Sequence, residues 1–232
     1  MKKITKYIPT IILTLLCSCS DYLDIVPDNV TTLDIVFNNR NTAERYLANC
    51  YHFVPDHGSV KRIPGMGAGH ECWFYTTNDS HFDNEVSFYI ARGLQNIDAP
   101  YANYWDGEGG SNLPMFRAIR ECNIFLDYVR DQHKVNDLTD SERKRWIAEV
   151  NVLKAYYHFF LFEHYGPIPI VDKALPVSTD PEGVKVTRMP VDQIVDYMVK
   201  LIDDSYKDLP PVITMEATEM GRLTQPAALA LK

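Results

Sequence analysis

The sequence predicts an all-α protein, a stack of helical hairpins of the tetratricopeptide kind with long irregular loops rich in aromatic residues. Apolar residues recur at helical spacing in several separate segments, which indicates amphipathic helices. The segment 141–165 is apolar on two faces, so it is expected to pack on two sides. Aromatic residues form 12% of the chain and gather between residues 73 and 105, where no helical period is visible.

The first helix is expected to begin near Asn41, with Asn41 as the N-cap and Glu44 completing a capping box. Pro55 and Gly58 are expected to end it. Its buried face recurs at four-three-four spacing and consists of Ala43, Leu47, Cys50 and Val54. Residues 55–112 then show little helical period, and a segment of this length without regular structure is often functional.

Two longer helices are expected at about 113–133 and from the neighbourhood of Asp140 or Ser141 to Tyr165. The first carries an apolar stripe of Met115, Ile119, Cys122, Leu126 and Val129. The second is stopped by Gly166-Pro167 and is interrupted only by a narrow polar line of Asn151, Lys154 and His158.

A fourth helix is expected from Pro190, because proline suits the first helical turn. A fifth is expected from Thr224 to Lys232. Since the helical pattern is still running at Lys232, we expect this sequence to be the N-terminal part of a longer protein.

The first eighteen residues have the pattern of a secretory signal. Lys2, Lys3 and Lys6 precede a short apolar run that is too short to span a bilayer. The run ends in Leu16-Cys17-Ser18-Cys19, which resembles a bacterial lipobox with Cys19 as the lipidated residue. The alternative is an ordinary cleaved signal peptide. Cleavage before Cys19 removes those lysines and leaves 20 basic and 31 acidic residues, a net charge of −11.

Composition and motifs exclude several classes of function. An acidic surface repels phosphate backbones, so nucleic-acid binding is not expected. The sequence contains no HExxH, CxxC, phosphate-loop or GxSxG pattern, so no metal, nucleotide or other cofactor is expected. The odd, widely spaced cysteines Cys50, Cys72 and Cys122 do not form a disulfide framework, and Cys50 and Cys122 are expected in the core.

The candidate ligand-binding residues are Trp73, Tyr75, Asn78 and Asp79, which lie within seven positions. Sugar rings stack their C–H faces on Trp and Tyr, and sugar hydroxyls exchange hydrogen bonds with Asn and Asp. The alternative is that these aromatic side chains only fill a loop core. A secreted hydrolase using loop carboxylates is the rival of a different class, because sequence spacing cannot place two carboxylates across a glycosidic bond.

Several stretches in order resemble the SusD/RagB family of nutrient-binding outer-membrane lipoproteins of the Bacteroidetes lineage. They are Cys19 to Pro27, Ala43-Glu44 with Asn49-Cys50-Tyr51, Phe116 to Leu126, Ala148 to Pro169, Arg188 with Pro190-Val191-Asp192, and Gly221-Arg222-Leu223-Thr224. The resemblance implies a tetratricopeptide-like scaffold without catalytic residues, anchored by lipid in the outer membrane and facing the cell exterior.

The resemblance also implies a partner and a cargo. Members of the family form a lid over a SusC-like TonB-dependent transporter and deliver oligosaccharides to it, or peptides in the RagB branch. The implied layout is a lipoprotein signal peptide at 1–18, a lipid-anchored extended tether at 19–39 and a SusD-like N-terminal helical domain at 40–232.

Overall fold

The computed structural model describes residues 32–58, 64–69, 86–98, 100–107, 113–176 and 182–232. The chain divides into two units, residues 1–36 and residues 37–232. In the first unit the described part holds one short helix, α2 (Leu33–Val36), which lies in the segment that the sequence predicted as extended.

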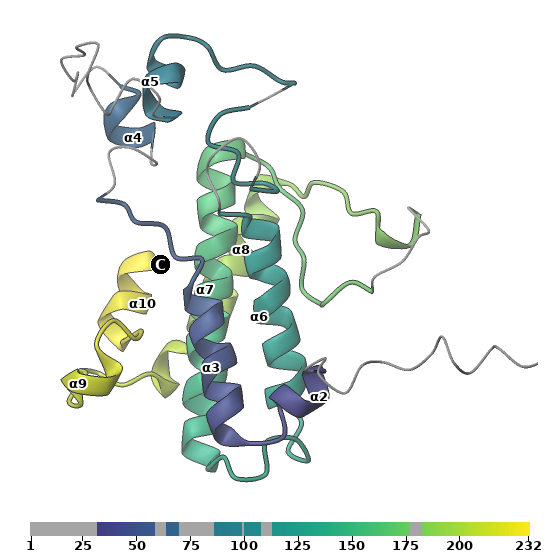
Figure 1. Cartoon of the computed structure of the whole chain (residues 1–232), viewed down its shortest axis with the longest axis vertical. Coiled ribbons are helices and arrows are strands. Elements are labelled where there is room, and N and C mark those ends of the chain that lie inside the picture. Colours follow the sequence, from purple (N-terminus) through teal and green to yellow (C-terminus); the bar gives the residue numbers. More distant parts are fainter. Residues whose placement is uncertain (1–31, 59–63, 70–85, 99, 108–112, 177–181) are drawn as a thin grey trace, which may run out of the picture. The chain divides into compact units, whose positions relative to one another are not determined.

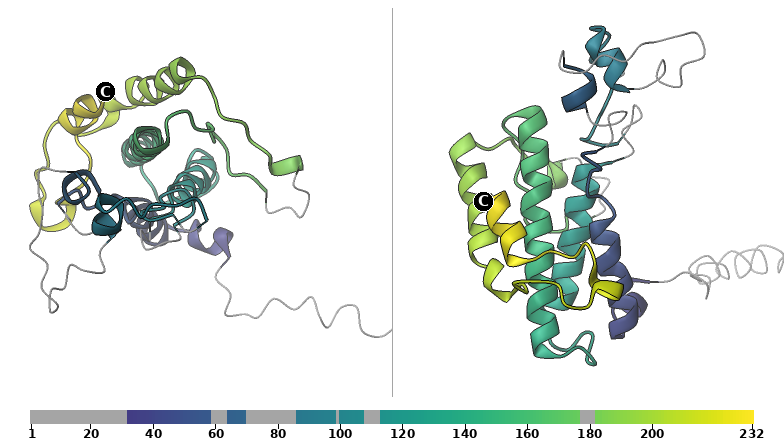
Figure 2. Two further views of the ribbon diagram at one scale, coloured as in Figure 1. Left: turned by 90° about the horizontal axis from the view of Figure 1, so that it is seen from above. Right: turned by 90° about the vertical axis from the view of Figure 1, so that its left-hand side faces the viewer.

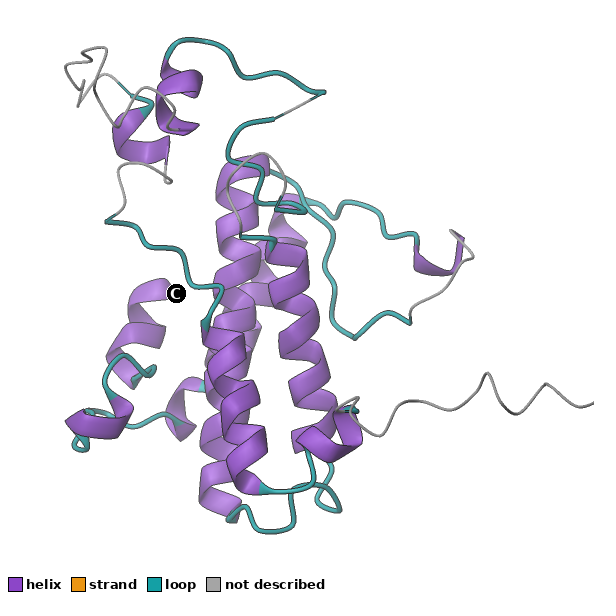
Figure 3. Cartoon of the chain, in the orientation of Figure 1, coloured by secondary structure: helices purple, strands orange, loops and turns teal. Residues whose placement is uncertain are grey.

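The second unit is built around four long helices, α3 (Arg40–Tyr51), α6 (Met115–Val129), α7 (Asp140–Tyr165) and α8 (Val191–Asp203). Helix α7 packs against α3, α6 and α8, and it runs through the middle of this group (Figures 1 and 2). The shorter elements are α4 (Pro64–Gly67), α5 (Val86–Ala91), η2 (Glu182–Val184), η3 (Tyr206–Asp208), α9 (Glu216–Glu219) and α10 (Gln225–Leu231). The parts of the chain that are described contain helices and loops only, so the all-α prediction is confirmed (Figure 3).

The ends of α7 follow from local chemistry. The Thr139 hydroxyl accepts a hydrogen bond from the Glu142 backbone N–H, and the Glu142 carboxylate accepts one from the Thr139 N–H, which is a complete capping box. The cap is therefore Thr139 and not Asp140 or Ser141. Gly166 ends the helix with a φ of 68°, a conformation that glycine adopts without strain. The predicted end at Tyr165 is confirmed.

The polar line predicted on α7 is buried. In the middle of this helix, residues 148–155, side chains on every side are buried, and α3, α6 and α8 pack against it. Asn151, Lys154 and His158 are 8%, 1% and 0% exposed, so each needs a partner inside the protein. The sequence predicted the position of this line, and the structure adds that the line lies inside the protein.

The remaining boundaries differ by a few residues from the predictions. Asn39 caps α3 by accepting from the Thr42 N–H at 3.0 Å, in place of the predicted Asn41. Helix α6 is shorter than 113–133. The buried Arg143 guanidinium donates to the carbonyl of its last residue, Val129 (2.6 Å), and to three carbonyls beyond the helix, those of Asp131 (3.3 Å), Lys134 (3.1 Å) and Val135 (2.9 Å). Arg143 thus gives the final carbonyl of α6 a partner that the helix itself does not supply.

In the stripe predicted for the first helix, Ala43, Leu47 and Cys50 are buried, whereas Val54 lies beyond the end of α3 and is 41% exposed, so that part of the prediction is wrong. The predicted stripes of α6 and α7 are confirmed. Every member of the α6 stripe is at most 1% exposed, and Trp146, Val150, Leu153, Tyr157 and Phe160 of α7 are at most 2% exposed. Cys50 and Cys122 are free and buried, as predicted. None of the described helices is both long and apolar enough for a membrane crossing.

Candidate functional site

The residues predicted from the sequence to bind ligand lie outside the described residues. Trp73, Tyr75, Asn78 and Asp79 fall in the gap between 69 and 86, and the predicted lipidation site Cys19 precedes residue 32. These assignments stay predictions. The described residues also contain no group of three metal-ligating side chains.

The described residues form a groove of about 720 Å³. One wall comes from the start of α6 and the turn before it, and the other from the connection between α7 and α8, residues 167–190 without 177–181 (Figure 1). We call it the α6 groove and define it by Trp105, Phe116, Arg120, Val171, Leu175 and Val186. Its walls are mostly apolar and carry a few polar groups, which is the usual composition of a small-molecule site.

Trp105 is fixed from three sides. Its ring lies 4.6 Å from Phe116 and 5.5 Å from Tyr165, both edge-on, and the Arg188 guanidinium lies over it at 5.1 Å. The Trp105 backbone N–H donates to the Asn103 side chain at 3.1 Å. A ring held in this way presents its remaining surface to the groove without a further loss of side-chain entropy on binding.

The turn before α6 depends on one glycine. Gly107 has a φ of 88°, and its N–H donates to the Asn103 carbonyl at 3.1 Å. A Cβ at this position would lie 2.9 Å from Pro114 Cδ, which is too close for any real side chain. The chain can therefore fold back to place Trp105 beside α6 only with glycine here.

The opposite wall is tied down at its base and along its length. The Met189 N–H donates to the Ile168 carbonyl at 3.0 Å, and Arg188 donates to the Pro167 carbonyl at 2.7 Å. Further along, the Arg120 guanidinium donates to the Leu175 carbonyl across the groove. These bonds hold residues 167–176 beside α6 and give the groove its depth.

Tyrosines beneath the groove are uncharged structural groups. The Tyr165 hydroxyl accepts from the Tyr104 N–H at 2.9 Å, and burial raises the pKa of Tyr165. Burial also raises the pKa of Tyr104 to about 12, and its ring packs edge-on against Phe160 and His164. His164 bonds the Phe160 carbonyl at 2.8 Å and packs in this cluster, so it is a structural histidine.

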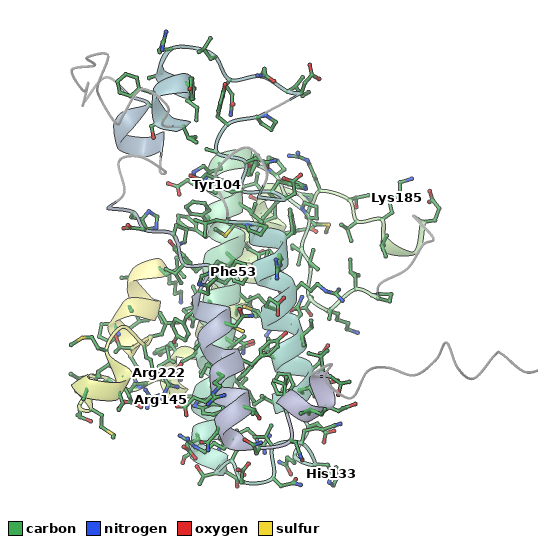
Figure 4. The ribbon with its side chains drawn as sticks, in the orientation of Figure 1. Phe53, Tyr104, His133, Arg145, Lys185 and Arg222 are labelled. Atoms are coloured by element: carbon green, nitrogen blue, oxygen red, sulfur yellow. The ribbon has the colours of Figure 1, made fainter. Side chains whose placement is uncertain are left out.

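Two buried ionic clusters also lie on α7. In the Glu149 cluster the carboxylate of Glu149, 0% exposed, accepts from Arg145 at 2.9 Å, from Arg222 at 2.9–3.1 Å and from the Tyr51 hydroxyl at 2.9 Å. Arg145 also binds Glu219 at 2.8 Å. Figure 4 shows Arg145 and Arg222 next to each other on the side of the bundle that carries α9. Both oxygens of this carboxylate are engaged by the protein itself, so it is a structural group.

In the Lys154 cluster the ammonium donates to the Asp172 carboxylate at 2.7 Å, and the Tyr197 hydroxyl donates to the same oxygen at 2.8 Å. His158 bonds the Lys154 carbonyl through Nδ1 at 2.7 Å, and its Nε2 accepts from the Val171 N–H at 3.4 Å. An accepting Nε2 requires a neutral ring that donates from Nδ1. Burial accordingly lowers the pKa of His158 to about 4.

Sequence reasoning did not find the α6 groove. Its basic groups, Arg117, Arg120, Lys173 and Lys185, are spread over two segments that no helical or strand period connects. Trp105 was one aromatic among many in an irregular stretch. The sequence feature closest to the groove was the motif from Phe116 to Asn123, which predicts the position of α6 but not the segment that packs opposite it.

The fold and the groove define the class: an all-helical, tetratricopeptide-like scaffold with a preformed cleft at the start of α6. The family model described as SusD-like, "starch-binding associating with outer membrane", matches residues 21–232. The chain therefore belongs to the SusD-like family, and the predicted resemblance is confirmed.

Solved structures share this fold. A "laminarin binding SusD-like protein" superposes with a TM-score of 0.63 at 18% identity, over 84% of this chain and 39% of the other. A SusD-like carbohydrate-binding protein from Bacteroides fragilis superposes with a TM-score of 0.60 at 22% identity, over 84% of this chain and 36% of the other. Surface glycan-binding protein A from Bacteroides thetaiotaomicron, solved with laminarihexaose, superposes with a TM-score of 0.58 at 18% identity, over 83% of this chain and 38% of the other. The chain thus spans less than two fifths of the length of each of these proteins. Comparison with curated proteins found no match.

Proposed function

We propose that this chain belongs to a cell-surface lipoprotein that captures oligosaccharides and delivers them, unaltered, to a SusC-like TonB-dependent transporter. Membership of a family described as starch-binding and associated with the outer membrane carries this proposal. The printed names of structural neighbours, which bind laminarin or laminarihexaose, support the same class of ligand.

The chemistry of the described residues is consistent with binding. The α6 groove offers a fixed indole, Trp105, on which a sugar ring can stack, together with polar groups that can bond hydroxyls. We propose that Trp73, Tyr75, Asn78 and Asp79 supply further contacts of the same kind.

The test is retardation of the protein in native gels that contain single polysaccharides, with product analysis of the same samples. Retardation without product supports capture. Formation of shorter sugars would instead support the hydrolase alternative, and binding of peptides but of no glycan would support the RagB-like alternative. Trp73→Ala is expected to weaken retardation, whereas Phe159→Ala, at a 38% exposed aromatic residue on α7, serves as the matched control.

The anchor is a separate proposal. We propose a signal peptide at 1–18, lipidation of Cys19, a tether at 19–39 and the helical domain at 40–232. Palmitate labelling in cells is expected to be lost in Cys19→Ala and kept in Cys17→Ala, because Cys17 lies in the removed peptide. Label that persists in Cys19→Ala would contradict the anchor without affecting the glycan-binding proposal.

A further inference from the structure

We infer that the α6 groove selects acidic oligosaccharides, that is, sugars that carry carboxylate or sulfate groups. This inference rests on the proposed function, since it names the class of glycan that the chain would capture.

The charge of the α6 groove is opposite to that of the whole chain. The whole chain has 31 acidic and 23 basic residues. The groove reverses that balance, because Arg117, Arg120, Lys173 and Lys185 line it together with a single acid, Asp106. The Asp106 carboxylate is already engaged by the Asn103 amide at 2.5 Å. These Arg and Lys side chains can donate hydrogen bonds to neutral hydroxyls, but their combined positive charge in a negative chain concentrates anions.

The basic groups differ in how firmly they are held. Arg120 is half-buried, and the groove wall at Leu175 accepts from only one of its nitrogens. A guanidinium has five N–H donors, so several stay available to a carboxylate or sulfate. Arg120 is therefore the fixed anion-binding group of the groove.

The other cations are exposed at its rim. The Arg117 side chain is 69% exposed and lies 3.8 Å from Glu121, a distance too long for a strong hydrogen bond. Lys173 is exposed. Lys185 forms an ion pair with Glu182 at 3.0 Å, and Figure 4 shows it on the outer part of the 167–190 connection. Arg117 and Lys173 are thus the groups that can best turn to a bound anion.

The apolar walls increase the effect of these charges. Trp105, Phe116 and Val186 exclude water from part of the groove, and charge interactions are stronger beside a wall of low dielectric constant. Helix α6 begins in the groove, so the positive end of its dipole adds to the field there. An acidic sugar fits both features, with its ring face on the apolar wall and its anionic group toward the cations.

The experiment measures affinity for three probes of similar length: an oligogalacturonate, a sulfated oligosaccharide and neutral laminarihexaose. We expect the acidic probes to bind more tightly and to lose affinity as salt rises, because salt screens exposed charges. The double variant Arg117→Gln/Lys173→Gln is expected to bind acidic probes about tenfold more weakly, since each exposed ion pair contributes a factor of about two to five. Comparison of the affinities for the oligogalacturonate and the sulfated oligosaccharide shows whether the groove prefers a carboxylate or a sulfate.

Lys144→Gln is the matched control, because Lys144 is an exposed lysine at the opposite end of α7. It is expected to bind all probes as the wild type does. Equal losses in Lys144→Gln and the double variant, or equal affinity for acidic and neutral probes, would overturn the inference. Binding of laminarihexaose alone would overturn it and leave the proposed function standing, whereas binding of no glycan in the wider panel would overturn the proposed function itself.

Discussion

The two ionic clusters of α7 each contain a buried charged side chain of that helix, but they differ in how exposed the partner charges are. Glu149 is enclosed and so are most of its partners, since the side chains of Arg145 and Arg222 are only 22% and 16% exposed. Lys154 is equally enclosed, with a side chain 2% exposed, but its partner Asp172 is 62% exposed. One cluster is buried on both sides of the ion pair and the other on one side only.

This difference determines what each cluster contributes to stability. Removing a charge from a doubly buried pair leaves the partner charge buried and uncompensated. Removing Lys154 leaves Asp172 able to turn to water. The pKa values follow the same logic: burial lowers the pKa of Lys154 despite its ion pair, whereas hydrogen bonds from Lys154 and Tyr197 outweigh partial burial and lower the pKa of Asp172.

The largest effect is expected for Glu149→Gln. The substitution keeps the shape but leaves the two buried guanidinium groups, Arg145 and Arg222, to share the single carboxylate of Glu219 at 2.8 and 3.5 Å, and we expect the free energy of unfolding to fall by about 3–5 kcal/mol. Urea denaturation measures it, with Glu163→Gln at an exposed site of α7 as the control. A loss as small as that of the control would show that the cluster is not stabilising.

The second effect depends on pH and comes from His158. Its pKa is about 4 in the folded chain against 6.5 unfolded, so between these values the unfolded state binds more protons and stability falls as pH falls. The full difference amounts to about 3 kcal/mol. Chemical denaturation at pH 7 and pH 4 is expected to show a smaller acid loss in His158→Gln than in the wild type. His133→Gln, at an exposed histidine, should keep the wild-type pH dependence.

The third effect tests the half-exposed pair directly. Lys154→Met keeps most of the side-chain volume and is expected to cost only about 1–2 kcal/mol, because Asp172 regains water. Denaturation midpoints of Lys154→Met, compared with those of the control Lys144→Met, measure this loss of stability. If Lys154→Met costs as much as Glu149→Gln, the exposure of the partner is not what separates the clusters.

The smallest effect concerns an uncharged pair near Lys154. The Asn151 amide donates to the Ser205 hydroxyl at 3.0 Å, and both residues are buried. Ser205→Ala is expected to cost about 1 kcal/mol, the usual value for one neutral hydrogen bond. The thermal midpoint, compared with that of Ser141→Ala, gives the measurement, and an unchanged midpoint would contradict a stabilising bond.

The sequence predicts helices well where apolar periodicity is long and a stop signal is strong. Helix α7 ends at the predicted Tyr165, since Gly166-Pro167 cannot continue it. The short helices α4 and α5 were not predicted, because six or fewer residues are too few to show a helical period. Asn39 and Asn41 are both good caps, and only the folded chain distinguishes them.

What the sequence cannot show is the environment created by irregular segments. Lys154 and His158 have hydrogen-bond partners, Asp172 and Val171, that lie in a connection without a helical period. The α6 groove arises in the same way, because its second wall is that connection. The predicted ligand-binding residues 73–79 are a prediction from residue chemistry alone and still await a test.

The guanidinium of Arg143 has a consequence for the order of folding. Its bonds reach carbonyls only 8 to 14 residues earlier in the chain, whereas Arg222 reaches Glu149 across 73 residues. Short loops close with less entropy lost, so the α6–α7 hairpin is expected to form early and the Arg222 contact late. Pulse-labelled amide exchange during refolding would show protection in α6 before α10, and the reverse order would contradict this sequence of events.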